Sequence, residues 1–120
     1  MPLDTRSLGR DVNEALVLTV LREEPRHGYE IALEVEERSE GAFELQHGTL
    51  YPILHRLEDE GLIEGEWSEE GRRRKVYHLT NAGRWHLGEE TARLRQGLER
   101  LSDLLPGWDD ETVQPRPATG

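Results

Sequence analysis

A run of four cations, Arg72-Arg73-Arg74-Lys75, is the most distinctive chemistry that this chain offers. It lies between two stretches rich in β-branched and aromatic residues, which places it at the tip of a predicted hairpin. Guanidinium groups match phosphate oxygens in a bidentate geometry, so such a tip suits contacts with a nucleic-acid backbone. The alternative is an ordinary solvated run, offset by the nearby Glu66, Glu69 and Glu70.

A second group of polar side chains precedes this hairpin, around the beginning of a predicted helix. Helix N-termini favour phosphates, and hydroxyl and amide groups there can reach phosphates or base edges. A polar helix followed directly by a basic hairpin is typical of a protein that reads duplex DNA. The alternative for Tyr51 is packing against the protein body, and an aromatic ring with a polar tip can do both. The residues predicted off the core side here are Gln46, His47, Thr49, Tyr51, Pro52 and His55.

The helix that holds this polar group is predicted from about Thr49. Pro52 then falls in the first turn, where its missing N–H costs nothing, and Gly61 is a natural residue to end the helix. The core-facing residues follow i, i+4, i+7 spacing and are Leu50, Leu54 and Leu57.

Two strands are predicted after this helix, over residues 62–67 and 75–80, with Trp67 in the core. A shorter helix is predicted before it, from about Tyr29 to Arg38, after a break at Pro25–Gly28. The predicted fold class is therefore mostly α with a small β-hairpin.

The first helix is predicted from the N-cap Asp11 to about Glu24 and is apolar on nearly every side. A helix of this kind is buried on more than one side, which a domain of this size can hardly achieve alone. We therefore expect a partner chain to cover Leu16 and Val20.

The longest helical pattern runs over residues 81–105 and reaches about 37 Å. Its apolar positions alternate in steps of four and three, as in a coiled coil, which predicts a dimerisation helix. Trp85 flanks this seam, where it serves either packing or the stacking of a flat aromatic ligand. The seam residues are Leu87, Thr91, Leu94, Leu98, Leu101 and Leu105.

Composition limits the classes of function. The 15 Lys and Arg against 25 Asp and Glu give a net charge of −10, which opposes long-range attraction to nucleic acid. Fourteen of the cations are arginine, a bias that fits either genomic base composition or adaptation to salt. The absence of cysteine excludes disulfides and thiolate metal sites. The five histidines show neither HxxxH nor HExxH spacing, so no metal site and no cofactor are predicted.

No catalytic constellation stands out. No serine lies in a nucleophile-elbow context, and no glycine-rich phosphate loop follows a strand, so the chain is not predicted to be an enzyme. No apolar run is long enough to span a membrane and no secretory signal is evident, which predicts a cytoplasmic protein with no membrane partner.

Three blocks of sequence carry a family resemblance: HGYEI (27–31), GTLYPILHRLEDEGLI (48–63) and RRRKVYHLTNAG (72–83). Together, in this order and at this spacing, they resemble the PadR family of transcriptional regulators over about residues 10–105. The single long C-terminal helix is similar to that of the short subfamily.

The resemblance implies a winged helix-turn-helix homodimer, usually a repressor that binds an inverted repeat. The helix from Thr49 would be the recognition helix, and Arg72–Arg74 the tip of the wing. Tyr29 and Tyr51 match tyrosines that the family places near the DNA backbone. Some short members bind flat aromatic drugs between subunits against a tryptophan of the last helix, and Trp85 lies near that position.

The expected organisation is a flexible arm over residues 1–9, a winged helix-turn-helix over 10–80, a dimerisation helix over 81–105 and a disordered tail over 106–120. The expected partners are double-stranded DNA, a second copy of the chain and a small aromatic effector. The chain departs from a DNA-binding pattern in charge, because residues 1–83 hold ten Arg and Lys against eighteen Asp and Glu. An adaptor that binds protein and not DNA is the alternative that this charge supports.

Overall fold

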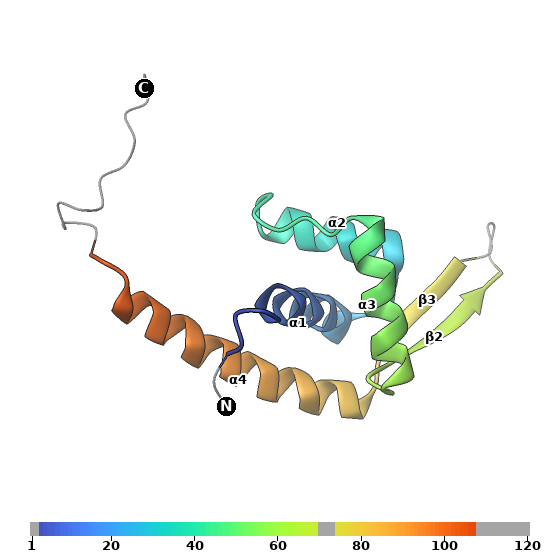
Figure 1. Ribbon diagram of the computed structural model, residues 1–120. Helices are drawn as coiled ribbons and strands as arrows, with labels where there is room; N and C mark the ends of the chain where they lie inside the picture. The colour runs from blue at the N-terminus through green and yellow to red at the C-terminus, as the bar shows by residue number, and fades with distance from the viewer. Residues whose placement is uncertain (1–2, 70–73, 108–120) are drawn as a thin grey trace, which may run out of the picture.

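The computed structural model describes residues 3–69 and 74–107, which form a helical body with a small sheet at one end (Figure 1). The three strands form an antiparallel sheet in the order β1-β3-β2. The elements are α1 (Leu8–Glu23), β1 (Arg26–His27), α2 (Gly28–Arg38), α3 (His47–Asp59), β2 (Ile63–Ser68), β3 (Arg74–Leu79) and α4 (Asn81–Leu104). The predicted helices and hairpin are confirmed, with boundaries that shift by one to three residues.

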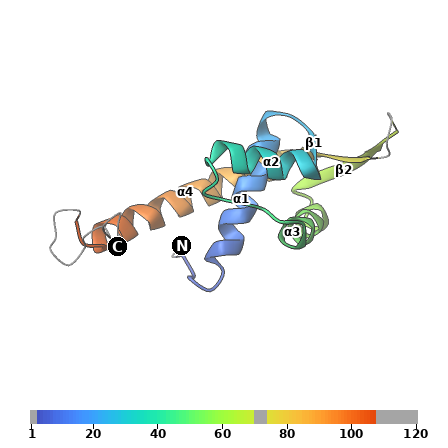
Figure 2. The same cartoon turned by 90° about the horizontal axis from the view of Figure 1, so that it is seen from above.

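Helix α1 is the centre of the core and is covered by its own chain. It packs against α4, α2, α3 and β3, and Figures 1 and 2 show it crossing between α2 and α4. The prediction that a partner must cover Val20 is therefore wrong, because this side chain is 2% exposed within one chain. Leu87 of α4 is likewise buried by its own chain, whereas Leu16 is half-buried at the edge of the core.

Strand β1 was not predicted from the sequence. Its two residues pair antiparallel with β3, Arg26 with Tyr77 and His27 with Val76. Two residues carry no detectable alternation, so only the pairing identifies them as a strand. The pairing has a functional consequence, because it brings the beginning of α2 to the side of the hairpin.

Helix α3 begins at His47, two residues before the predicted start. Pro52 consequently lies in the second turn and not the first, and it cannot donate an N–H to the carbonyl of Gly48, four residues earlier. Gly48 is exposed to solvent, so water can satisfy that carbonyl. The core face of α3 is as predicted and consists of Leu50, Ile53, Leu54 and Leu57.

The chain enters α4 by passing close to Leu62, the residue before the beginning of β2. Thr80 caps the helix, since its hydroxyl accepts from the Gly83 N–H at 3.0 Å. A Cβ added to Gly83 would lie 2.1 Å from the carbonyl oxygen of Leu62 and 2.6 Å from Leu79 Cδ1. Only glycine fits this position without moving backbone.

The predicted flexible arm over residues 1–9 overlaps described structure from residue 3 onward. Helix α1 already begins at Leu8, and a turn precedes it in which the Ser7 N–H donates to the Asp4 carbonyl at 3.0 Å. Leu3 packs directly over Gly97 of α4, where an added Cβ would lie 2.0 Å from Leu3 Cδ1. The absence of a side chain at Gly97 thus leaves room for Leu3 to pack against α4.

Candidate nucleic-acid interface

The polar side of α3 is open to solvent for its whole first half. Opposite the buried leucines, every predicted residue of this face is exposed: Gln46 at the N-cap, His47, Thr49, Tyr51, Pro52 and His55. The rings of His47 and Tyr51 stack with centroids 5.3 Å apart and an interplanar angle of 23°. A helix buried on one side and presenting imidazoles, hydroxyls and a phenol on the other can enter a groove of a duplex.

Beside α3, the hairpin presents Arg74 at the start of β3. Its Nη1 lies 3.0 Å from Nε2 of His27, and that nitrogen also lies 3.2 Å from Oε1 of Glu30. Arg72 and Arg73, which were predicted to share this role, lie outside the described residues. Within 3–69 and 74–107, Arg74 forms no ion pair with a carboxylate, so its charge is available to an anion.

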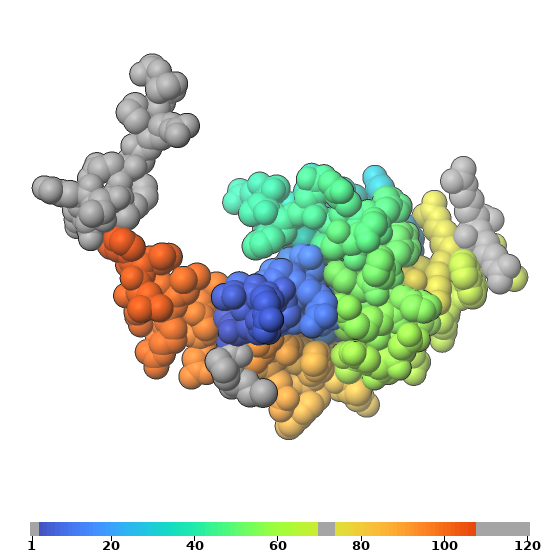
Figure 3. All heavy atoms as spheres, viewed as in Figure 1, coloured from blue at the N-terminus to red at the C-terminus, as the bar shows by residue number. Residues whose placement is uncertain are grey.

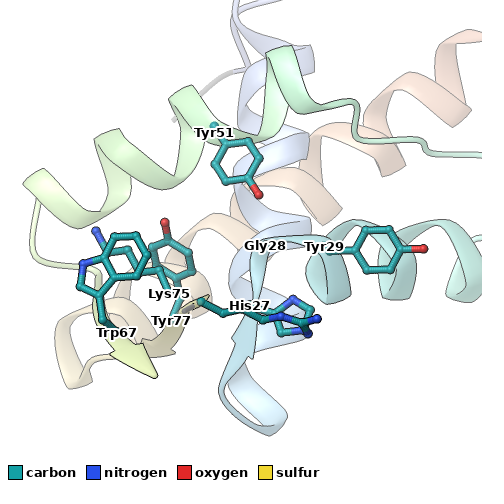
Figure 4. Close-up of a pocket in the computed structure, with 8 residues that line it drawn as sticks. His27, Gly28, Tyr29, Tyr51, Trp67, Lys75 and Tyr77 are labelled. Carbon is teal, nitrogen blue, oxygen red and sulfur yellow. The ribbon is translucent and has the colours of Figure 1, made fainter. Parts of the chain in front are cut away.

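A hollow of about 550 Å³ lies between the first turn of α2, α3 and the hairpin (Figure 4). Its walls are aromatic and cationic: His27, Gly28, Tyr29, Tyr51, Trp67, Arg74, Lys75 and Tyr77. Figure 4 shows Tyr51 pointing from α3 into the hollow and Tyr29 pointing away along α2. The site therefore brings Tyr51, Arg74 and Lys75 together, while Tyr29 lies at its edge.

The position of Tyr51 is set by Gly28. A Cβ on Gly28 would lie 2.8 Å from the Tyr51 hydroxyl and 3.1 Å from Cζ of the ring, so the phenol rests on the beginning of α2. His27, which precedes this glycine, contacts Arg74, and its backbone N–H donates to Glu30 Oε1 at 3.2 Å. Sequence reasoning missed this role of His27. The signal that could have found it is its position three residues before a glutamate at a helix start.

One side chain differs from the sequence prediction: Trp67, expected in the core, is 57% exposed. Lys75, predicted to contact DNA, has a partner on α3 that the sequence did not indicate, since its Nζ donates to Glu58 Oε1 at 2.9 Å. This hydrogen bond raises the pKa of Lys75 above its usual value, so the ammonium stays charged. Burial raises the pKa of the neighbouring Tyr77, which stays neutral.

Most cations of the body are already paired with carboxylates. Arg38 binds Glu23 and Glu34, Arg56 binds Glu14, and Arg93 binds Asp11 and Glu90. Because carboxylates outnumber cations, these pairs leave unpaired carboxylates and a negative charge on the helical body.

The predicted dimerisation seam is partly open. Leu94 is half-buried in its own chain, while Leu98, Leu101 and Leu105 are 54%, 46% and 58% exposed. Figure 3 shows the C-terminal half of α4 extending from the body. A groove of about 550 Å³ runs along it, lined by Leu3, Leu8, Gly97, Leu98, Leu101 and Leu104 among others. The side chain of Trp85, at the other end of α4, is 73% exposed.

The described part of the chain offers no cluster of three or more histidines and carboxylates that could hold a metal ion. Among the same residues, no helix combines the length and apolar character needed to cross a membrane.

The model of the transcriptional regulator PadR-like family matches residues 17–89 of this chain. The transcriptional regulator Rv3488 of Mycobacterium tuberculosis is 41% identical over 79 residues, which span 65% of this chain and 70% of that protein.

Solved structures give the same result. A PadR family transcription regulator from hypervirulent Clostridium difficile R20291 is 34% identical, with a TM-score of 0.68 over 78% of this chain and 97% of that one. The Bacillus subtilis PadR in complex with operator DNA is 25% identical, with a TM-score of 0.61 over 87% of this chain and 53% of that one. The predicted mostly helical, winged helix-turn-helix fold is confirmed by these neighbours.

Proposed function

Because this chain belongs to the PadR-like family of transcriptional regulators, we propose that it binds duplex DNA as a homodimer and represses transcription from an inverted-repeat operator. The observation that carries the proposal is the exposed polar face of α3 beside Arg74, on a helix whose other face is wholly buried. The similarity to a PadR that was solved with operator DNA supports it.

In this proposal α3 enters the major groove and the hairpin acts as the wing on the backbone or minor groove. Side chains of Gln46, Thr49 and His55 are suited to base edges, because amide, hydroxyl and imidazole groups donate and accept hydrogen bonds there. Tyr51 and Arg74 are suited to phosphates. Tyr29, 64% exposed at the rim of the hollow, is proposed as a further backbone contact.

The homodimer is proposed from the open seam of α4. Leu98, Leu101 and Leu105 form an apolar stripe that extends from the body into water, and a second copy is the occupant that matches it in length and chemistry. Two copies related by a two-fold axis would present two α3 helices about 34–36 Å apart, one turn of duplex DNA. An inverted repeat follows from that symmetry.

The direct test is a mobility-shift titration with the chain's own upstream region at two salt concentrations. Specific binding that weakens steeply with salt is the expected result. The competing proposal, an adaptor that binds protein and not DNA, is favoured by the net charge of −10. If the chain is such an adaptor, it should bind the upstream region and unrelated DNA equally weakly at both salt concentrations.

Replacement of Arg74 by alanine should weaken operator binding. It should also make the negative slope of log K against log salt less steep by about 0.9, the value for one phosphate contact. The exposed guanidinium of Arg74 contacts His27 and pairs with no carboxylate of the described residues, which makes Arg74 a cation well placed for a phosphate. The matched control is Arg95→Ala, which removes an exposed arginine from α4. An equal change in slope in both variants would show that Arg74 acts only through net charge.

An effector is proposed at Trp85, whose ring is exposed on α4. A planar aromatic cation or neutral compound stacked on this ring in the dimer would quench tryptophan emission and lower operator affinity. Trp85→Phe should abolish the quenching, whereas Trp67→Phe should leave it in place. Quenching that survives in Trp85→Phe and is lost in Trp67→Phe would move the binding site to the hollow beside α3.

A further inference from the structure

The side chain of Lys75 crosses the hairpin to reach α3. Lys75 starts on β3, passes over Gly65 of β2, and ends at Glu58 in the last turn of α3. A Cβ on Gly65 would lie 2.4 Å from Lys75 Cε and 3.2 Å from Glu58 Oε2. Because Gly65 has no side chain, the Lys75 side chain has room to cross β2 at this position.

Aromatic rings line this crossing. Trp67 lies directly opposite Lys75 in the strand register, and Gly65 lies opposite Tyr77, so all four residues share one face of the sheet. The Lys75 ammonium lies 5.9 Å from the centroid of Trp67 and 5.5 Å from that of Tyr77. Figure 4 shows Trp67, Lys75 and Tyr77 gathered together below α3. Rings at this distance attract the cation.

We propose that the Glu58–Lys75 pair is a strut that fixes the angle between the wing and α3, so that Lys75 positions the wing and does not contact phosphate. The inference rests on the proposed function, because a wing angle matters only if both elements meet the same duplex. Glu58 lies in the last turn of α3 and Lys75 is the second residue of β3, so the pair joins the two elements proposed to face DNA.

Charge supports positioning over phosphate contact. A phosphate drawn to Lys75 would also meet the Glu58 carboxylate, whose oxygen lies 2.9 Å from the same ammonium. The pair carries no net charge and adds little attraction for a polyanion. If Lys75 left Glu58 for a phosphate, it would strand a carboxylate beside the DNA, which is unfavourable.

The decisive variant is the charge swap, Glu58→Lys with Lys75→Glu, which keeps the net charge of the chain. Lys75→Glu alone places two carboxylates together and should weaken operator binding about 10- to 100-fold. The swap should restore affinity to within about threefold of the original, with an unchanged salt slope. If Lys75 instead contacted phosphate, the swap would not restore operator affinity, and the negative slope of log K against log salt would become less steep by about 0.9.

A second variant tests the path and leaves all charges in place. Gly65→Ala should push Lys75 off Glu58 and weaken operator binding about three- to tenfold, with an unchanged salt slope. Gly88→Ala is the matched control on α4, outside α3 and the hairpin, because an added Cβ there meets nothing within 4 Å. Unchanged affinity in Gly65→Ala would overturn the strut.

A third measurement needs no DNA. A double-mutant cycle on unfolding, built from Glu58→Gln and Lys75→Met, should show coupling between the two residues, and additivity would contradict the pair. If the original chain binds no specific DNA while the cycle shows coupling, the proposed function fails and the pair remains. If the original chain binds and the swap is not rescued, the strut alone fails.

Discussion

Replacing Leu98 and Leu101 with aspartate should leave the chain folded, monomeric and unable to hold a two-half-site operator. Each leucine is about half exposed in one chain, so a dimer buries the remaining half of four side chains. At about 1.5–3 kcal/mol for a fully buried leucine, that burial contributes roughly 3–6 kcal/mol. Its loss weakens the dimer by about 10²- to 10⁴-fold, before the cost of placing aspartate in the seam.

Sedimentation at micromolar concentration measures the oligomeric state, and a mobility shift with one and two half-sites measures the consequence. The control is Gly88→Asp with Ala92→Asp, which adds the same two negative charges to exposed positions of α4 away from the seam. A dimer that persists in the seam variant, or that is lost equally in the control, would contradict the assignment of the seam.

Gly83→Ala should be the most destabilising single methyl group that can be added to this chain. The new Cβ would lie 2.1 Å from the Leu62 carbonyl oxygen, and backbone cannot move aside as a side chain can. The Thr80 cap holds α4 at this close approach through the Gly83 N–H. Overpacking costs about 1–3 kcal/mol and occasionally more, so urea unfolding should shift to a clearly lower midpoint.

Gly88→Ala, five residues along the same helix, is the matched control. Nothing lies within 4 Å of a Cβ at Gly88, so alanine should raise stability by about 0.5–1 kcal/mol through helix propensity alone. If both variants shifted the unfolding midpoint in the same direction, the close approach at Gly83 would not be what sets its effect.

Local patterns predicted much of the fold. The i, i+4, i+7 leucines of α3 and the long apolar repeat of α4 are visible in one dimension, because helical spacing alone places them on one face. The basic turn between two β-rich stretches likewise predicted the hairpin. The exposed face of α3 could be predicted as well, because Leu50, Leu54 and Leu57 show which side is buried and the opposite side must face solvent.

What the sequence could not supply is the partner of each side chain in space. Apolarity shows that α1 is covered, but the same pattern fits a neighbouring subunit or the chain's own α4, and the structure has α4. Trp67 alternates as a strand residue should, yet it lies at the turn end of the hairpin, one pair before Ser68 and Arg74, and is 57% exposed. Lys75 looks like the fourth member of a cationic run until Glu58, 17 residues earlier, is placed beside it.

The binding surface divides in the same way. The polar residues of α3 were found from the sequence because they share one element. His27 and the hollow were missed because three separate segments build them: the β1–α2 junction, α3 and the hairpin. Contacts between elements far apart in sequence carry no local signature.

The opening of the Glu58–Lys75 pair can also be followed by chemical modification of the Lys75 amine. Lys75 is the single lysine of this sequence, so a reagent for lysine side chains has one target in it. The hydrogen bond to Glu58 raises the pKa of Lys75 and so holds its nitrogen in the unreactive ammonium form. Acylation of this side chain at neutral pH should therefore be slow, and its rate reports how often the ion pair opens.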